Sequence, residues 1–381
     1  MTRSYELAIL GSPSESQLEA IEQCLCEAVQ LFWLELGKQV SWEVLPARFN
    51  PSQRRAAAAL FLCARGAPTG NLDELLARGI PIVPVVTEAE PVRQVVPPKL
   101  ARFNCLTYDP ATPERAAAAL LECAGLLPSQ RRVFVSYRRD EARGAATQLF
   151  DEFSARFFDV FLDTHGIAPA ADLQMVLSHR LCDSDVLVML DTPSYFESRW
   201  TSAEFGRALA KGISVLRVGW PDFAPSAQTA TASRVDLTDT DIDAASGRIA
   251  DPAVGRICAH LEIVRSQSHA VRNVNLLSNI RHAVERIGGT VAGVGIRNAI
   301  YVQLPDNQQL VASPAVAVPT STHFHNATTR VILGHAAVVY DAVEVDPACQ
   351  SRLDWLGAEL RTAKLVKAHE VARTLAAWGD S

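Results

Sequence analysis

The sequence predicts an α/β protein organised around a parallel sheet, and observations in the stretch 131–222 support this class. Short apolar runs with the composition of strands alternate there with segments whose apolar residues recur every three to four positions, as on the buried face of a helix. The run 186–190 is almost wholly apolar, as expected of a strand covered on both faces. Because strands alternate with helices, we expect a doubly wound, flavodoxin-like sheet.

The elements of this central region follow one another in a regular order. Apolar runs predict strands at 133–137, 159–163, 186–190 and 213–218. Helical spacing predicts helices around 145–153, around 173–181 and over 200–209. Ligands of such sheets bind where the carboxyl ends of the strands meet. We therefore expect three polar segments to converge at one edge: 136–138, the loop after Asp163 and the loop before Trp200.

Three sequence blocks in this region resemble the signature blocks of a bacterial Toll/interleukin receptor (TIR) domain. They read VFVSYRR at 133–139, FDVFLD at 158–163 and SRWTSAE at 198–204, in the order and spacing of the family. The resemblance implies the TIR fold for 131–222. In the NAD-cleaving branch it also implies hydrolysis of the nicotinamide–ribosyl bond of NAD+. That branch depends on the Glu four residues after the Trp, which is Glu204 here.

The chemistry of that reaction explains why a carboxylate is needed. Departure of nicotinamide builds positive charge on the ribose, and a fixed carboxylate can hold the ribose hydroxyls and stabilise that charge. Nicotinamide leaves as a neutral molecule, so one carboxylate suffices and no general acid is required. NAD+ enters as the substrate, and we expect neither a cofactor nor a metal.

The resemblance assigns the catalytic role to Glu204. The residues expected to bind the substrate are Ser136, Tyr137, Arg138, Arg139, Asp163 and Trp200. Trp200 shares a helix face with Glu204 and could wall the pocket or stack on a flat ring, while packing of the helix on the sheet is the alternative. Glu204 could instead be a solvated first-turn residue favoured by the helix dipole.

Arg138 and Arg139 could anchor a diphosphate, because guanidinium groups match phosphate oxygens. An ion pair with Asp140 or Asp163 is the alternative for both arginines.

The sequence departs from the family pattern at two turns. Phe157 stands where the family usually has a glycine in a left-handed cap, and a side chain there should cost about 1 kcal/mol if the turn is kept. Pro169-Ala170 stands where the loop after the second strand usually reads Pro-Gly, and that loop gates the pocket in the family.

Length and composition limit the classes of function. With 381 residues, the chain is long enough for two or three domains. Its net charge of −6 and lack of a basic patch argue against a nucleic-acid partner. We find no signal sequence and no run of apolar residues that could span a membrane, so a cytoplasmic location without a membrane partner is expected. Its 8 cysteines are scattered without metal-binding spacing, which predicts reduced thiols.

The pattern of residues 1–127 predicts another α/β domain, and the short polar break at 127–132 predicts a linker. Strands are expected at 5–10, 40–45, 57–63 and 80–86, and helices at 15–36, 72–78 and 115–123. When Gly79 is matched with Gly212, Asn71 falls at the position of Glu204. This suggests a non-catalytic TIR-like duplicate, although an unrelated flavodoxin-like domain gives the same pattern. The segment 11–14 could bind an anion at a helix N-terminus or act as a plain N-cap.

Residues 222–250 lose their periodicity, and the small, polar stretch 224–231 within them predicts a flexible connection over the surface. Residues 250–381 predict a C-terminal α+β domain. Its helices are expected at 253–264, 274–287, 349–360 and 366–378, and its strands at 299–304, 309–311 and 336–339. His323 and His325 could bind a metal if they lie on a strand, but a polar loop is the simpler interpretation. Trp355 and Trp378 are expected in the core, and an unknown ligand or trigger could act on this domain.

Two main functions are compatible with the sequence. The first is a TIR NAD+ glycohydrolase that releases nicotinamide and ADP-ribose, or a cyclic isomer, in bacterial stress or antiphage signalling and self-associates through its TIR domains. The second is a non-catalytic TIR scaffold acting in signal transduction through contacts between like domains. A third possibility is a nucleotide-binding sensor whose role is carried by the flanking domains.

Overall fold

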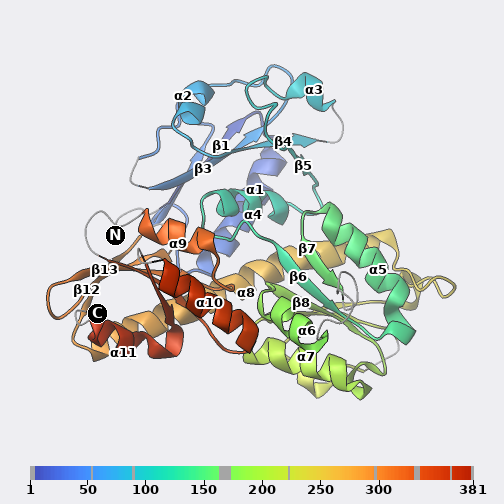
Figure 1. Ribbon diagram of the computed structural model, residues 1–381. Helices are drawn as coiled ribbons and strands as arrows, with labels where there is room; N and C mark the ends of the chain where they lie inside the picture. The colour runs from blue at the N-terminus through green and yellow to red at the C-terminus, as the bar shows by residue number, and fades with distance from the viewer. Residues whose placement is uncertain are drawn as a thin grey trace. The chain divides into compact units, whose positions relative to one another are not determined.

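The computed structural model describes residues 5–52, 55–87, 91–162, 173–221, 224–295, 298–329, 335–360 and 363–378 (Figure 1). The chain forms two compact units, Met1–Ser129 and Gln130–Ser381. The division falls within the stretch 127–132 that the sequence predicts as a linker. The central and C-terminal regions lie together in the second unit.

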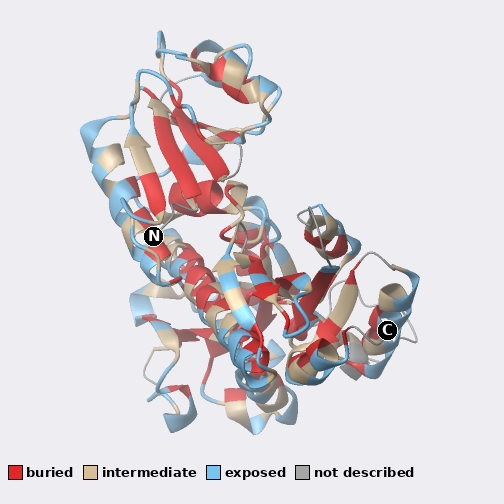
Figure 2. Cartoon of the chain, turned by 90° about the vertical axis from the view of Figure 1, so that its left-hand side faces the viewer, coloured by how far each residue is buried: buried red, intermediate tan, exposed pale blue. Residues whose placement is uncertain are grey.

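A parallel sheet of five strands forms the centre of the N-terminal unit, in the order β2-β1-β3-β4-β5. The strands are β1 (Tyr5–Gly11), β2 (Val40–Val44), β3 (Ala56–Leu62), β4 (Ile82–Thr87) and β5 (Leu106–Tyr108). The helices are α1 (Glu15–Gln30), α2 (Leu72–Ala77), α3 (Val92–Val95) and α4 (Glu114–Cys123). Every residue of β3 is buried, as its apolar sequence indicates, and the strands of this sheet are largely buried in Figure 2.

Three details of this unit differ from the sequence prediction. Neither β5 nor α3 was predicted, because both are too short to show a clear period. Helix α1 ends at Gln30 rather than at residue 36, because the chain turns at Trp33, which has a positive φ of 58°.

The central sheet is also parallel and has five strands, in the order β10-β9-β8-β6-β7. The strands are β6 (Arg132–Ser136), β7 (Asp159–Leu162), β8 (Val186–Asp191), β9 (Ser214–Gly219) and β10 (Ser233–Asp236). When each sheet's strands are counted along the chain, both sheets have the flavodoxin-like order 2-1-3-4-5. The predicted doubly wound parallel sheet is therefore confirmed.

Helices cover both faces of the central sheet (Figure 1). They are α5 (Arg139–Ala155), α6 (Leu173–Cys182), α7 (Arg199–Ala210) and α8 (Asp251–Arg286). Val133 and Val135 of β6 pack with residues of α5 and α8, whereas Phe134 packs with residues of α6 and α7. This alternation follows from the two-residue period of a strand.

The turn after α5 has the conformation that the family pattern requires. Phe157 has a φ of 64°. Its N–H donates to Ser154 O at 3.0 Å, and the N–H of Phe158 donates to Phe153 O at 3.1 Å, which is the bonding pattern of a left-handed helix cap. The Phe157 side chain is 61% exposed, so it gains little from packing in this position. Pro169-Ala170 lies outside the described residues.

The sequence predicted no strand in the aperiodic segment 222–250. Just after the predicted connection at 224–231, however, the chain forms β10, the fifth strand of the central sheet, which pairs in parallel with β9 from Ser233 to Asp236. Only Val235 of this strand is buried, so the apolar pattern is too short to be recognised from the sequence.

The two helices predicted at 253–264 and 274–287 are one continuous helix, α8. The intervening segment is polar, and the sequence suggested a break there. It stays helical because its polar side chains have partners on the central sheet: Arg265 pairs with Asp185 at 3.0 Å, and Ser268 Oγ accepts a hydrogen bond from the Ser214 N–H at 3.1 Å. The first part of α8 packs on the central sheet and its last part packs on the C-terminal sheet.

The C-terminal sheet is mixed, in the order β11-β12-β13-β14-β15. Its strands are β11 (Thr290–Val294), β12 (Ile300–Gln303), β13 (Gln309–Ala315), β14 (His335–Tyr340) and β15 (Lys364–Lys367). The pairs β11–β12 and β12–β13 are antiparallel, and the other two pairs are parallel. The helices are α9 (Ser321–Thr328), α10 (Pro347–Glu359) and α11 (Val371–Ala376).

Several predictions for this region need correction. Strands β11 and β15 were not predicted, and the helix expected from residue 366 starts at Val371 because the preceding residues pair with β14. Trp378 is buried, as expected, whereas Trp355 is 65% exposed and does not belong to the core. None of the helices in the described residues combines the length and apolar character that crossing a bilayer requires.

His323 and His325 lie in α9 and not on a strand or in a loop. His323 Nδ1 accepts a hydrogen bond from the Thr320 N–H at 3.1 Å, so its ring completes the cap of this helix. This pair therefore lacks the strand placement on which its predicted metal role depended.

Candidate functional site

Three buried side chains form a hydrogen-bonded chain at the carboxyl edge of the central sheet. Ser136 ends β6, Tyr195 lies in the short turn after β8, and Glu204 lies on α7. Ser136 Oγ is 2.5 Å from Glu204 Oε2 and 2.7 Å from the Tyr195 hydroxyl oxygen. Ser136 and Tyr195 are fully buried, with 0% of their surface exposed, and Glu204 is 6% exposed.

The direction of these hydrogen bonds follows from the donors available. Ser136 has one hydroxyl proton, which it donates to the Glu204 carboxylate, so the Tyr195 hydroxyl donates to Ser136 Oγ. Burial raises the pKa of Tyr195 well above its ordinary value, and the nearby charge of Glu204 raises it further. Tyr195 therefore stays a neutral donor, and Ser136 presents a directed donor to the carboxylate.

Glu204 faces inward because of its position on α7. Thr201, Phe205 and Ala208 lie on the same helix face and are also buried. Ser198 caps the helix by accepting from the N–H groups of Trp200 and Thr201, and the Thr201 hydroxyl donates to Tyr195 O. Because Glu204 is buried, the alternative interpretation of Glu204 as a solvated residue of the first helical turn is wrong.

Trp200 is 50% exposed, so it does not pack between helix and sheet. It precedes Glu204 by one helical turn, and the guanidinium carbon of Arg199 lies 5.9 Å from the centre of its ring. An aromatic surface is thus accessible on the helix that carries the carboxylate.

The other predicted site residues differ in their surroundings. Tyr137 is buried in the core with residues of α5, and Arg139 is exposed. Arg138 precedes α5, and its Nη1 donates to Ser194 O at 3.2 Å, across the sheet edge in the turn that also carries Tyr195. Asp163 lies outside the described residues, so its predicted role stays a prediction.

Sequence reasoning missed Tyr195 and the ionic contacts of the buried Arg217. Arg217 Nε on β9 is 2.5 Å from Oδ2 of the buried Asp191, and its Nη1 is 2.6 Å from Oδ1 of the exposed Asp236. Burial raises the pKa of Asp191, although its bond to Arg217 opposes this. A Cβ on Gly219 would lie 2.6 Å from Arg217 Nη1, so glycine leaves room for the guanidinium. The sequence offered one signal of this ion pair: β8 and β9 are otherwise apolar, and each contains a single charged residue, Asp191 and Arg217, respectively.

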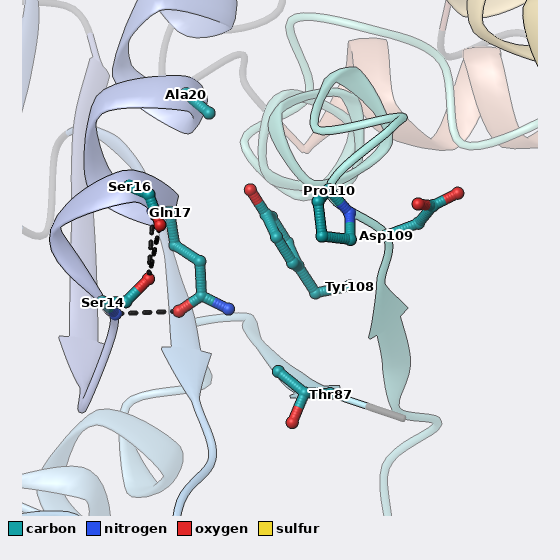
Figure 3. A pocket seen from close by; sticks show the side chains of 8 residues that line it. All are labelled: Ser14, Ser16, Gln17, Ala20, Thr87, Tyr108, Asp109 and Pro110. Carbon is teal, nitrogen blue, oxygen red and sulfur yellow. Dashed lines mark hydrogen bonds between the residues drawn. The ribbon is translucent and has the colours of Figure 1, made fainter. Parts of the chain in front are cut away.

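A second candidate site is a pocket of about 620 Å³ in the N-terminal unit (Figure 3). The start of α1 lines one side, and the ends of β4 and β5 line the other. Its residues are Ser14, Ser16, Gln17, Ala20, Thr87, Tyr108, Asp109 and Pro110. None of these belongs to the predicted site.

The polar groups at the start of α1 have local partners. Gln17 N–H donates to Ser14 Oγ at 3.2 Å, and Ser14 N–H donates to Gln17 Oε1 at 2.8 Å. Ser14 is therefore an ordinary N-cap with a reciprocal capping bond, as one of the two interpretations of the segment 11–14 proposed.

Asn71, which was matched with Glu204, bonds to the backbone of the N-terminal unit. Its amide donates to Phe49 O at 2.8 Å and accepts from the Phe49 N–H at 3.2 Å. This side chain fixes a loop and carries no charge. The predicted lack of catalysis in this unit stays a prediction.

Comparison with known protein families supports the sequence resemblance. Residues 133–249 match the family model of the TIR domain. The match covers β6 through β10, and it includes the stretch 224–231 that the sequence predicted as a connection. A comparison of the chain with curated proteins finds no match.

Proposed function

Residues 133–249 form a TIR domain, and we propose that this domain is an NAD+ glycohydrolase. It would cleave the nicotinamide–ribosyl bond of NAD+ and release nicotinamide. Attack of water on the ribose would give ADP-ribose, whereas attack of a ribose or adenine group of the same molecule would give a cyclic isomer. Glu204 would hold the ribose hydroxyls and stabilise the positive charge that develops on the sugar. The biological setting that fits this proposal is bacterial stress or antiphage signalling.

The hydrogen bond from Ser136 to Glu204 carries this proposal. It holds a carboxylate at the sheet edge where ligands of this fold class bind. A carboxylate can accept about four hydrogen bonds, and the Ser136 hydroxyl occupies one of these acceptor positions. The proposal requires that hydroxyl groups of a ribose reach another position of the same carboxylate.

The remaining predicted residues fit roles in binding the rest of NAD+. Arg138 and Arg139 lie at the start of α5, where a guanidinium and the helix N-terminus both favour a diphosphate. The exposed indole of Trp200 could contact a flat ring of the substrate. These assignments extend the family resemblance to residues of this chain.

Measurement of nicotinamide release by chromatography tests the proposal. We expect Glu204→Gln to lower the rate by at least about 100-fold, because it removes the charge while keeping the shape of the side chain. Glu197→Gln is the matched control, since Glu197 is an exposed glutamate in the turn before α7. Equal release by wild type and Glu204→Gln would remove Glu204 from the mechanism.

The alternative function is a non-catalytic TIR scaffold, and the exposure of Trp200 is the observation that favours it. A half-exposed indole suits a contact with a second domain. In this case Trp200→Ala would weaken self-association in analytical ultracentrifugation, while wild-type protein would release no nicotinamide at any concentration.

A further inference from the structure

His179, Asp346 and Cys349 form a cluster within the unit Gln130–Ser381, on the side of α6 that faces the start of α10. One potential ligand atom of each residue lies within 4.8 Å of those of the other two. His179 Nδ1 is 3.5 Å from Asp346 Oδ2. The three residues supply a nitrogen, an oxygen and a sulfur atom, and they come from two helices that are far apart in the sequence.

The start of α10 sets the positions of two of these side chains. Asp346 is the N-cap of this helix, and its Oδ1 accepts a hydrogen bond from the Cys349 N–H at 2.9 Å. This bond uses one carboxylate oxygen and leaves the other, Oδ2, on the side of His179. The cap therefore presents the carboxylate and the thiol of Cys349 from a single helical turn.

Contacts around the cluster hold α6 and α7 against the segment before α10. The Cys182 thiol donates to Glu344 O at 2.9 Å. Lys211 Nζ donates to Asp341 O at 2.6 Å and to Val343 O at 2.8 Å. The cluster thus sits in a junction that is already fixed by other bonds, which reduces the cost of ordering its side chains.

The surroundings of His179 point to a missing partner. Its Nδ1 atom is buried and makes no hydrogen bond with any of the described residues. A buried ring nitrogen without a hydrogen bond is unusual, and binding of an ion or a water molecule would satisfy it. Two ligands bound to a tetrahedral zinc ion lie roughly 3.4 Å apart, close to the separation of His179 and Asp346.

We propose that His179, Asp346 and Cys349 bind a Zn²⁺ ion that links α6 of the TIR domain to α10. Imidazole and thiolate are the ligands that zinc prefers, and a carboxylate completes a three-residue set that leaves one position for water. The His179 side chain is 33% exposed, which provides a path for the ion. Binding replaces the thiol proton of Cys349, so one proton is released for each ion bound.

Metal analysis of untagged protein tests the site directly. After incubation with zinc and removal of free metal, we expect one zinc per wild-type chain, and its loss in Cys349→Ser and His179→Gln. Substitution with cobalt should give the thiolate-to-metal absorption band of wild type and no such band in Cys349→Ser. Cys182→Ser is the matched control, because Cys182 is a buried cysteine at the same junction outside the cluster.

Asp346→Asn separates metal binding from helix capping. Asparagine can still accept the Cys349 N–H bond as an N-cap, but it lacks the carboxylate charge. We expect this variant to keep its unfolding midpoint without metal and to lose most of the rise that zinc produces in wild type. At a free zinc concentration of 100 times Kd, that rise corresponds to roughly a 100-fold higher ratio of folded to unfolded protein.

An ordinary His179–Asp346 ion pair predicts different results. Wild type would then retain no zinc, and zinc would leave its unfolding midpoint unchanged. Either result would overturn the proposal, as would equal zinc content in wild type and all three cluster variants, because zinc would then bind elsewhere.

Discussion

At the scale of single residues, the main feature of the candidate site is the orientation of one carboxylate. The Glu204 side chain points into the protein and accepts a hydrogen bond from the Ser136 hydroxyl. The Tyr195 hydroxyl in turn donates a hydrogen bond to Ser136 Oγ. The chain Tyr195–Ser136–Glu204 connects the turn after β8, the end of β6 and the middle of α7. The position of the proposed catalytic group thus depends on neutral donors beneath it.

Removing the middle member of this chain should impair both catalysis and stability. Ser136→Ala deletes the donor to Glu204 and leaves the buried Tyr195 hydroxyl without its acceptor. We expect slower nicotinamide release and a free energy of unfolding lower by about 1–3 kcal/mol, measured in urea. Tyr195→Phe keeps the donor to Glu204 and should retain more activity. Greater loss of activity in Tyr195→Phe than in Ser136→Ala would contradict this account.

Phe157 allows a prediction about stability alone. Phe157→Gly should raise the free energy of unfolding by about 1 kcal/mol, because glycine adopts a positive φ without the strain of a Cβ atom. The exposed phenyl ring contributes little packing that could be lost. Phe157→Ala is the control: it shortens the side chain but keeps Cβ, so an equal stabilisation by alanine would rule out backbone strain as the cause.

At the scale of elements, α8 has the largest structural role in the second unit. Its first part covers the central sheet, its last part covers the C-terminal sheet, and its polar middle is held by Asp185 and by the backbone of β9. A polar segment between two apolar helical patterns normally indicates a loop. Here tertiary partners satisfy the polar groups, so the helix continues.

His269 on α8 gives this helix a predicted pH dependence. Burial lowers the pKa of His269 to about 3, and the charges of Arg265 and Arg272 act in the same direction, against Asp185. The unfolded chain, with a histidine pKa of about 6.5, then binds a proton that the folded chain does not. The free energy of unfolding should therefore fall as the pH drops below about 6.5 toward 3.

Urea unfolding at about pH 7.5 and about pH 5.5 measures this effect. We expect His269→Gln to reduce the loss of stability between the two conditions, whereas His282→Gln, at an exposed position of the same helix, should not. Part of the His269 surface remains accessible, so the loss should be smaller than full burial would produce. An unchanged slope in His269→Gln would show that other groups cause the pH dependence.

At the scale of the whole molecule, the TIR resemblance implies that a neighbouring domain completes the pocket. Nicotinamide release per chain should then rise with protein concentration. A sharper test mixes dilute wild type with an excess of the inactive variant Glu204→Gln. We expect the mixture to be more active than wild type alone, because the variant supplies the neighbouring surface without adding a carboxylate. Constant activity per wild-type chain in all mixtures would exclude activation by assembly.

More of the fold than of the candidate site could be predicted from the sequence. The strands β6, β8 and β9 were predicted because an apolar run bounded by turns is a local property of the sequence. Residues 133–249, which contain these strands, match the TIR family model. Glu204 was selected through the family resemblance, whose third block places it four residues after Trp200, and its catalytic role stays a prediction. Tyr195 was missed, because a tyrosine in a polar loop shows its role only when Ser136 is placed beside it.

The amino-acid pattern alone was enough for the alternation of strands and helices and for the TIR blocks, because these depend on neighbours within a few residues. The left-handed turn at Phe157 was expected only if this chain kept the turn of the family, and the structure shows that it does. Tertiary structure alone decided that β10 joins the central sheet, that α8 continues through its polar middle, and that His179 meets Cys349. Each of these outcomes depends on a contact with residues that are distant in the sequence. A local sequence pattern cannot show whether such a contact forms or how much it stabilises the structure.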